Sequence, residues 1–254
     1  MIDETLLTPP FQRLSIFYPM WNEEEYVARA VRAGVDVCLT LIEHGEIEDF
    51  EIIVVDDAST DDTAKIADDL ASRDPRIRVV HHETNRKLGG SIKTGLSSAS
   101  GDVVLYTDAD LPFDMTELLR AVRILRTYEA DMVCAYRLDR TGEGFRRAAY
   151  SWAYNSLIEA AFRTRVRDVN FAFKLMRRDV IDAIELVSEG SFIDAELVAR
   201  ARGLGFHIIQ IGVDYFPRSR GISTLSSMSV IRTMLGEMRS LRKELRDVRP
   251  LPKQ

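Results

Sequence analysis

The chain has 254 residues, of which 46% are hydrophobic, so it is long enough for one large α/β domain or two small domains. No apolar run approaches the roughly 20 residues that cross a bilayer, and the acidic first segment lacks the basic and apolar regions of a signal peptide. The formal net charge is −6, yet residues 216–254 carry nine basic and three acidic side chains, which leaves a strongly acidic body unsuited to a nucleic-acid groove.

The first half of the sequence alternates between short apolar runs and amphipathic segments. The runs predict strands at residues 14–18, 50–55, 77–80, 103–107 and 132–135. The segments between them predict helices at 22–41, 60–72, 91–99 and 115–128. Asn22 and Glu25 have the spacing of a capping box for the first helix, and Ser59 or Thr60 is suited to cap the second.

This alternation with short connections predicts an α/β fold with a mostly parallel, doubly wound sheet and helices on both faces. Three of the predicted strands end in polar clusters, at Asn22-Glu23, Asp56-Asp57 and Asp108-Ala109-Asp110. Because the carboxyl ends of parallel strands meet at one edge of a sheet, we expect these clusters to lie along a common ligand crevice.

The second half of the sequence is less regular. Helices are predicted at 148–162, 193–202 and 229–246, strands at 169–176 and 207–213, and loops with Gly and Arg at 137–147 and 218–224. Cys38 and Cys134 lie far apart in apolar surroundings, which indicates buried free thiols and a reducing compartment. Without a CxxC motif or a His pair at ligand spacing, a structural zinc site is not expected.

Two carboxylates follow the strand at 103–107. In an extended chain Asp108 and Asp110 project to the same side while Ala109 turns away. Two adjacent carboxylates favour a divalent cation, and Mg²⁺ or Mn²⁺ is often held by one or two carboxylates together with substrate phosphates. The pair therefore predicts a metal and diphosphate site, with a solvated turn as the alternative.

Other residues near these strand ends are candidates for binding a nucleotide. Asp57 is suited to accept hydrogen bonds from a base or ribose, and Trp21 either stacks on a base or is a half-buried packing residue. Lys87 either meets a phosphate, with Gly89 and Gly90 allowing close backbone approach, or is a surface turn lysine. Because GxGxxG and GxxxxGK[ST] motifs are absent, a dehydrogenase and a P-loop enzyme are poor interpretations.

Three motifs in the same order resemble family 2 glycosyltransferases. Pro19-Met20-Trp21-Asn22-Glu23 is similar to their Pro-x-Tyr-Asn-Glu, Asp56–Asp61 to their Asp-Asp-x-Ser-x-Asp, and Asp108-Ala109-Asp110 to their Asp-x-Asp. The resemblance covers residues 14–224, and residues 168–174 and 218–223 are most similar to polyprenyl-phosphate sugar synthases such as the dolichyl-phosphate mannose and glucose synthases.

The resemblance implies a GT-A fold, a nucleotide-diphosphate sugar donor, Mg²⁺ or Mn²⁺, and inversion at the anomeric carbon. It implies a nucleoside pocket lined by Pro19, Trp21, Glu23 and Asp57. Asp108 is expected near the ribose and metal, and Asp110 on the metal. Arg137 falls where the family has a basic residue that faces phosphate, and the loop expected to close over the phosphates contains Arg218 and Ser223.

The sequence departs from the family pattern at several positions. Trp21 replaces the usual Tyr, and Pro112 stands where a Gln often helps to hold the metal, so the third protein ligand is open, with Asp114 as a candidate. The closing loop has Thr224 in place of a Lys. Many relatives carry C-terminal membrane helices, for which this sequence shows no counterpart.

The preferred acceptor is a phosphate monoester, because the sequence offers several arginines that can bind it. It is largely a dianion at neutral pH, so it needs cations to hold it rather than a general base. Guanidinium groups that can bind it are Arg137, Arg146 and Arg218, while Arg147 and Arg220 are more simply surface residues. For a hydroxyl acceptor, Asp194 is the candidate base, although it is also a typical helix N-terminal charge, and Asp168 is a candidate for organising the acceptor side.

The C-terminal segment forms a separate unit in our division of the chain, with a catalytic domain at 1–225 and a basic amphipathic helix and tail at 226–254. That helix can lie on a lipid surface, pack on the domain or pair with a second copy. We expect a cytoplasmic enzyme, peripheral on the inner face of the membrane, that transfers sugar to a polyprenyl phosphate. The alternatives are transfer to a soluble or polysaccharide hydroxyl and a non-catalytic sugar-nucleotide-binding module.

Overall fold

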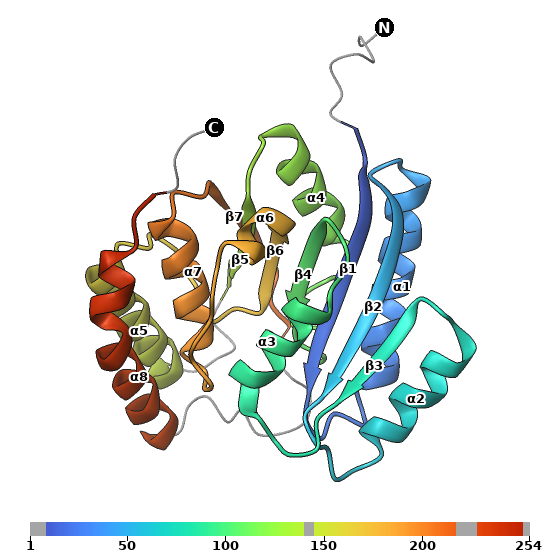
Figure 1. The fold of residues 1–254 in the computed structure, drawn as a ribbon, viewed down its shortest axis with the longest axis horizontal. Helices are drawn as coiled ribbons and strands as arrows, with labels where there is room; N and C mark the ends of the chain where they lie inside the picture. Colours follow the sequence, from blue (N-terminus) through green and yellow to red (C-terminus); the bar gives the residue numbers. More distant parts are fainter. Residues whose placement is uncertain (1–8, 140–144, 217–227, 251–254) are drawn as a thin grey trace, which may run out of the picture.

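The computed structural model describes residues 9–139, 145–216 and 228–250. Its centre is one seven-stranded sheet (Figure 1). The strands are β1 Phe11–Met20, β2 Ile47–Asp56, β3 Ile77–His81, β4 Val103–Thr107, β5 Met132–Arg137, β6 Phe173–Arg177 and β7 Ile208–Val213. The helices are α1 Val27–Glu43, α2 Thr63–Arg73, α3 Lys87–Ser98, α4 Glu117–Thr127, α5 Phe145–Phe162, α6 Arg178–Asp182, α7 Ile193–Gly203 and α8 Met228–Asp247.

The strands follow the order β3-β2-β1-β4-β6-β5-β7. All neighbouring strands pair in parallel except β6, which is antiparallel to both β4 and β5. Met20 at the end of β1 is paired with Asp56 at the end of β2, and Asp56 is paired with His81 at the end of β3. The mostly parallel α/β sheet is thus confirmed, and its carboxyl ends share an edge.

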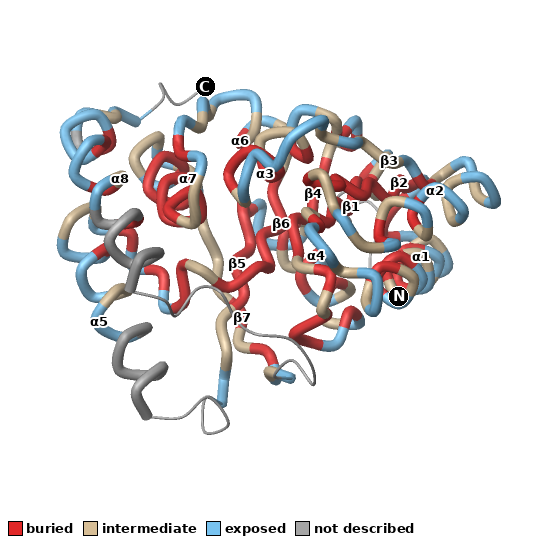
Figure 2. The backbone as a smooth tube through the Cα atoms, turned by 90° about the horizontal axis from the view of Figure 1, so that it is seen from below, coloured by how far each residue is buried: buried red, intermediate tan, exposed pale blue. Residues whose placement is uncertain are grey.

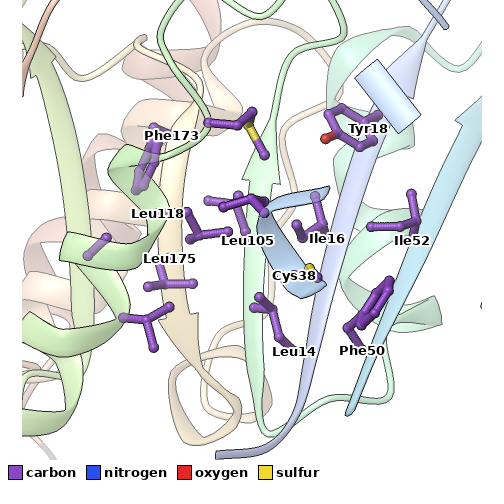
Figure 3. Packing of buried hydrophobic residues seen from close by; sticks show 14 of the residues in the cluster. Leu14, Ile16, Tyr18, Cys38, Phe50, Ile52, Leu105, Leu118, Phe173 and Leu175 are labelled. Carbon is purple, nitrogen blue, oxygen red and sulfur yellow. The ribbon is translucent and has the colours of Figure 1, made fainter. Parts of the chain in front are cut away.

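The sheet is buried on both faces, which explains the continuous apolar runs of its strands. On one face, α1, α2 and α4 cover a core that includes Ile16, Leu105 and Phe173 (Figure 3). On the other face, α3 and α5–α8 cover a second core that includes Phe17 and Tyr106. Figure 2 shows the buried strands between these two helical layers. Cys38 and Cys134 are free and buried, as predicted.

Two capping predictions are wrong. Helix α1 begins at Val27 and has no side-chain cap. Asn22 instead adopts a φ of 55°, donates its backbone N–H to Ser59 Oγ at 3.0 Å and accepts the Thr60 N–H at 2.8 Å. These polar side chains join the loop after β1 to the loop after β2, so they are not available to cap α1 or α2.

The sheet departs from the sequence prediction at β6. Residues 169–172 form a turn rather than the beginning of a strand, with the Phe171 N–H donated to the Asp168 carbonyl at 3.1 Å, and β6 begins at Phe173. The short helix α6, which follows β6 directly, was not predicted.

Helix α8 packs against α7 and α5. Among its described side chains, the buried apolar ones are Met234, Met238, Leu241 and Leu245. The Arg200 guanidinium on α7 donates to Glu244 on α8 at 2.6 Å, and the Gly190 N–H donates to Glu237 at 3.0 Å. The apolar stripe predicted for this helix therefore packs on the domain. Within the described ranges, no helix has the length and apolar character needed to cross a bilayer.

Candidate active site

The carboxyl edge of the sheet collects the polar clusters that the sequence places after its strands. The loops after β1 and β2 are tied together by the Asn22 hydrogen bonds, and the Asp57 N–H donates to the Met20 carbonyl at 2.8 Å. β4 is the other neighbour of β1, so the Asp108–Asp110 segment emerges beside them. The predicted common edge is therefore present.

Asp57 is held rigidly at this edge. Its side chain and that of His82 are each only 5% exposed. Asp57 Oδ1 accepts the Arg86 backbone N–H at 2.7 Å and lies 2.6 Å from His82 Nδ1, while its carbonyl accepts a hydrogen bond from Asn85. The carboxylate is thus fixed by the segment that connects β3 to α3, and its orientation does not depend on a ligand.

The other predicted nucleotide-pocket residues lie on the neighbouring segments and differ in exposure. Trp21 follows β1 and is 52% exposed, so its ring face is open to a ligand. Pro19 is half-buried within β1, and Glu23 is half-buried with its N–H donated to Thr63 Oγ1 at 2.8 Å. Lys87 is exposed as the first residue of α3.

Gly89 and Gly90 both allow close packing around the start of α3. A Cβ at this position would lie 2.5 Å from the Ser188 carbonyl oxygen, and the Gly89 N–H donates to the Glu189 carbonyl at 2.9 Å. At Gly90 a Cβ would meet Arg86 Cβ at 2.4 Å. Gly89 therefore lets α3 pack closely on residues 188–189, and Gly90 leaves room for the Arg86 side chain at the start of the helix. The role in phosphate approach stays a prediction.

The Asp-x-Asp segment lies just beyond β4. The strand ends at Thr107, and Ala109 and Asp110 form a turn, so the extended geometry expected for this motif does not continue through it. The alternation in burial is nevertheless kept, because Ala109 is buried while Asp108 and Asp110 are half-buried.

The charge around this turn fits a divalent cation. Burial raises the pKa of Tyr106 well above its usual value, and the negative charges of Asp194, Asp108 and Asp110 raise it further. Among the residues that the structure describes, no group of three or more His, Cys, Asp or Glu side chains is placed to hold a metal ion by itself. Asp114 is exposed, and its Oδ1 accepts the Thr116 N–H at 2.9 Å. The half-buried Asp108 and Asp110 carboxylates are oxygen donors of the kind that a hard divalent ion takes together with a bound diphosphate.

Arg137, the last residue of β5, is clamped in one orientation. Its Nε and Nη2 donate to the two oxygens of Asp168 at 2.7 and 2.9 Å, and the two side chains are 11% and 2% exposed. The guanidinium also lies over the rings of Phe171 and Tyr215, at 5.6 and 5.1 Å from their centroids. A bidentate pair with aromatic contacts presents a cation of fixed position and direction.

Aromatic packing joins this cation to the Asp-x-Asp turn. The ring centroids of Phe113, just beyond that turn, and Phe171 lie 5.8 Å apart, and those of Phe171 and Tyr215 lie 6.4 Å apart. In addition, the Phe216 N–H donates to the Pro112 carbonyl at 2.8 Å. The segments after β4, β5 and β7 and the turn before β6 therefore meet in one site.

A buried ion pair lies beneath this site. Lys174 on β6 donates to Asp194 in the first turn of α7 at 2.5 Å and to the Phe171 carbonyl at 3.0 Å, and its ammonium lies 5.3 Å from the centroid of the Tyr106 ring. The Lys174 and Asp194 side chains are only 1% and 4% exposed. Burial raises the pKa of Asp194, and the Lys174 charge acts in the opposite direction.

Some predicted residues lie outside the described part. Arg218 and Ser223, with Arg220, fall in residues 217–227, and the side chains of Arg146 and Arg147 are also outside it. Conversely, sequence reasoning missed His82 and Lys174. His82 had a usable signal, since it directly follows β3 at the carboxyl edge, whereas Lys174 lies within an apolar run and gave none.

Comparison with known proteins identifies the family and the fold. The family described as "Glycosyl transferase family 2" matches residues 15–185, more than half of the chain. Glycosyltransferase AglD from Haloferax volcanii is 32% identical over 228 residues, which cover 88% of this chain and 35% of that protein. Undecaprenyl-phosphate 4-deoxy-4-formamido-L-arabinose transferase from Pseudomonas fluorescens is 30% identical over 89% of this chain and 63% of its own length. The chain thus spans less than two thirds of these two relatives.

Two further relatives are similar to this chain over most of both sequences. Polyprenol monophosphomannose synthase from Mycolicibacterium smegmatis is 27% identical over 89% of this chain and 85% of its own length. Glucosyl-3-phosphoglycerate synthase from Mycobacterium tuberculosis, in complex with phosphoglyceric acid, has a TM-score of 0.66 at 25% identity, covering 89% of this chain and 79% of that one. The same enzyme with Mn²⁺, uridine-diphosphate-glucose and phosphoglyceric acid has a TM-score of 0.68 at 23% identity, covering 91% and 80%. The GT-A fold is confirmed, and the chain belongs to glycosyl transferase family 2.

Proposed function

We propose that this glycosyltransferase moves a sugar, with inversion, from a nucleotide-diphosphate sugar to a polyprenyl phosphate. The observation that carries the proposal is the clamped Arg137 in the same site as the Asp108–Asp110 turn. The acidic Asp108–Asp110 turn is suited to a metal-bound diphosphate, and the fixed Arg137 guanidinium is suited to bind a second phosphate. Two of the relatives described above are named for transfer to polyprenyl acceptors, which supports this choice of acceptor.

On the donor side, each residue has a separate task. Asp57 accepts a hydrogen bond from the nucleoside, and the exposed Trp21 ring offers a stacking face. Pro19 and Glu23 border the same pocket, and Lys87 is placed to meet a phosphate. Mg²⁺ or Mn²⁺ held by Asp108 and Asp110 would supply positive charge to the departing diphosphate.

On the acceptor side, the protein has to hold a dianion rather than remove a proton. A phosphate monoester is already largely ionised at neutral pH, so it can attack the anomeric carbon without a general base. Arg137 orients this phosphate, because Asp168 and the Phe171 and Tyr215 rings prevent the guanidinium from turning away. Arg146, Arg218 and Ser223 remain predicted acceptor contacts outside the described side chains.

A second candidate is transfer to the hydroxyl of a soluble, phosphate-bearing acceptor. It is favoured by the fold likeness to glucosyl-3-phosphoglycerate synthase, whose structure contains phosphoglyceric acid. A hydroxyl acceptor needs a base, and Asp194 is the predicted one. Its carboxylate is buried against Lys174, which supports a positioning role for it instead.

The deciding experiment offers three acceptors with a panel of sugar nucleotides and Mn²⁺ or Mg²⁺: a short polyprenyl phosphate, 3-phosphoglycerate and a neutral sugar. We expect nucleotide release and a lipid-linked product only with the polyprenyl phosphate. Asp110→Asn should lower turnover by at least about 10²-fold. The matched control Asp182→Asn replaces an exposed acid at the end of α6, beyond the end of β6 that faces away from the site, and should leave turnover unchanged. Faster transfer to 3-phosphoglycerate or to the neutral sugar would refute the polyprenyl assignment, and nucleotide binding without turnover would indicate a non-catalytic module.

We also propose that the enzyme works in the cytoplasm, at the inner face of a membrane that contains its acceptor. Four apolar side chains of α8, Met234, Met238, Leu241 and Leu245, are buried within the domain, so we expect membrane contact to be electrostatic rather than by insertion. Among the described side chains near the end of this helix, the exposed basic ones are Arg239, Arg242, Lys243 and Arg249. Flotation with vesicles that contain anionic lipid, and its loss at high salt, is the expected result. Sedimentation as a dimer without vesicle binding would favour pairing of two copies instead.

A further inference from the structure

The Asp57 carboxylate has one oxygen engaged by the protein and one that the protein leaves to a ligand. Oδ1 lies 2.7 Å from the Arg86 backbone N and 2.6 Å from His82 Nδ1. In the part of the chain that the structure describes, no residue donates a hydrogen bond to Oδ2. Both oxygens of a carboxylate can accept hydrogen bonds. In Asp57, Oδ1 is already occupied by the protein before a nucleotide binds, and Oδ2 is the oxygen that remains to accept from one.

The partners of the two His82 nitrogens indicate which one carries the proton. The Asp57 carboxylate can only accept, so Nδ1, which lies 2.6 Å from Asp57 Oδ1, carries the proton of that hydrogen bond. Nε2 is then the acceptor in the neutral ring, and it lies 2.9 Å from Thr94 Oγ1, a hydroxyl that can donate to it. The ring is nearly buried, so water does not compete for either nitrogen.

We propose that His82 is a positioning residue that keeps Asp57 Oδ1 occupied, so that Oδ2 alone reads the base and selects a uracil-type base in the donor. This inference rests on the proposed function, in which Asp57 lines the nucleoside pocket. Uracil presents one ring N–H between two carbonyl groups, which a single oxygen satisfies. Guanine presents a ring N–H beside an exocyclic amino group and would need both oxygens. Cytosine has no ring N–H, and its ring nitrogen and the carboxylate are both acceptors.

Equilibrium binding of the nucleoside diphosphates UDP, GDP and CDP to the full chain with Mg²⁺ tests this proposal. Intrinsic tryptophan fluorescence, to which Trp21 and Trp152 both contribute, or calorimetry provides the readout. We expect UDP to bind at least about tenfold more tightly than GDP or CDP, because a buried polar group left unpaired is costly. GDP binding as tight as UDP binding would overturn the inference, and failure of all three to bind would overturn the proposed function as well.

Substitutions separate positioning from simple structural support. His82→Phe removes the donor and should reduce the UDP-to-GDP affinity ratio by about tenfold, whereas His82→Asn retains a donor near the Nδ1 position and should restore most of the ratio. His44→Phe, an exposed control, should leave the ratio unchanged. With UDP-sugars, His82→Phe should raise KM much more than it lowers kcat. A ratio unchanged in His82→Phe would refute the role of His82 even if the variant were less stable.

A measurement on the unmodified protein covers the case in which His82→Phe does not fold. Nitrogen-15 NMR of the imidazoles should show His82 with its proton on Nδ1 in the absence of nucleotide. Thr94→Val, which removes the donor to Nε2, should weaken UDP binding less than His82→Phe does but in the same direction. A proton on Nε2 in the unmodified protein would contradict the proposal, because His82 could then not donate to Asp57.

Discussion

The buried ion pair between Lys174 and Asp194 offers a quantitative test of how the floor of the site is stabilised. Replacing Lys174 by Met keeps the aliphatic length of the side chain but removes its charge. Asp194 would then be a nearly buried carboxylate without its cation. Removing one partner of such a pair costs about 3–5 kcal/mol, a large part of the ~5–15 kcal/mol that stabilises a typical domain.

This loss should depend on pH in a defined direction. Burial already raises the folded-state pKa of Asp194, and Lys174 opposes that effect, so Lys174→Met should raise it further. A carboxyl group with a raised folded-state pKa favours folding most below its unfolded pKa of about 3.9, and this contribution is lost as the pH rises through the folded value. The variant should therefore be less destabilised at acidic pH than at alkaline pH.

Urea denaturation of the wild type and variants at pH 5 and pH 8 measures both effects. The double variant Lys174→Met with Asp194→Leu should recover much of the stability, because apolar side chains often replace a buried pair at little cost. Arg73→Ala, which breaks an exposed pair with 71% and 53% exposed side chains, is the control and should cost less than about 1 kcal/mol. A cost below about 1 kcal/mol for Lys174→Met at pH 8, or a cost independent of pH, would refute the reasoning.

Three further outcomes are expected. Asp110→Asn should lower the rate of nucleotide release by at least about 10²-fold, as measured with saturating Mn²⁺, because it weakens electrostatic stabilisation of the leaving group. Asp168→Ala should release Arg137, raise the KM for the acceptor phosphate and lower the unfolding free energy by about 3–5 kcal/mol, as measured by kinetics and by urea denaturation. Cys38 and Cys134 should not react with a thiol reagent until the protein is unfolded, because burial raises the pKa of both thiols, that of Cys134 to about 12.

The parallel half of the sheet was predictable because its signals are local. β4 has the predicted limits, and the continuous apolar run of β2 indicated a strand covered on both faces. The strand ends then fixed the edge on which polar residues meet, without knowledge of any contact. Where helices begin was less predictable, since the Asn22 side chain caps no helix and instead bonds to Thr60, 38 residues away in the sequence.

The antiparallel part was not predictable from local pattern. In residues 169–176 every second side chain is apolar, which is the pattern of a strand with one face in solvent. That pattern would place Lys174 on the solvent face. In the structure both faces are covered, and Lys174 is buried because it pairs with Asp194, 20 residues further along the chain. The position of His82 beside Asp57 likewise depends on the pairing of β2 with β3. Such partners follow from tertiary structure, which a single sequence does not specify.

The reversed direction of β6 explains how the two sides of the site come together. Because β6 is antiparallel to β4 and β5, the residues that precede it, rather than those that follow it, lie at the carboxyl edge of the sheet. The turn at 168–172 therefore enters between the ends of β4 and β5, where Asp168 binds Arg137 and Phe171 contacts Phe113. A parallel strand at this place would carry that turn to the opposite edge. One reversed strand thus brings a fixed cation beside the acidic turn, which the proposed transfer between two phosphates requires.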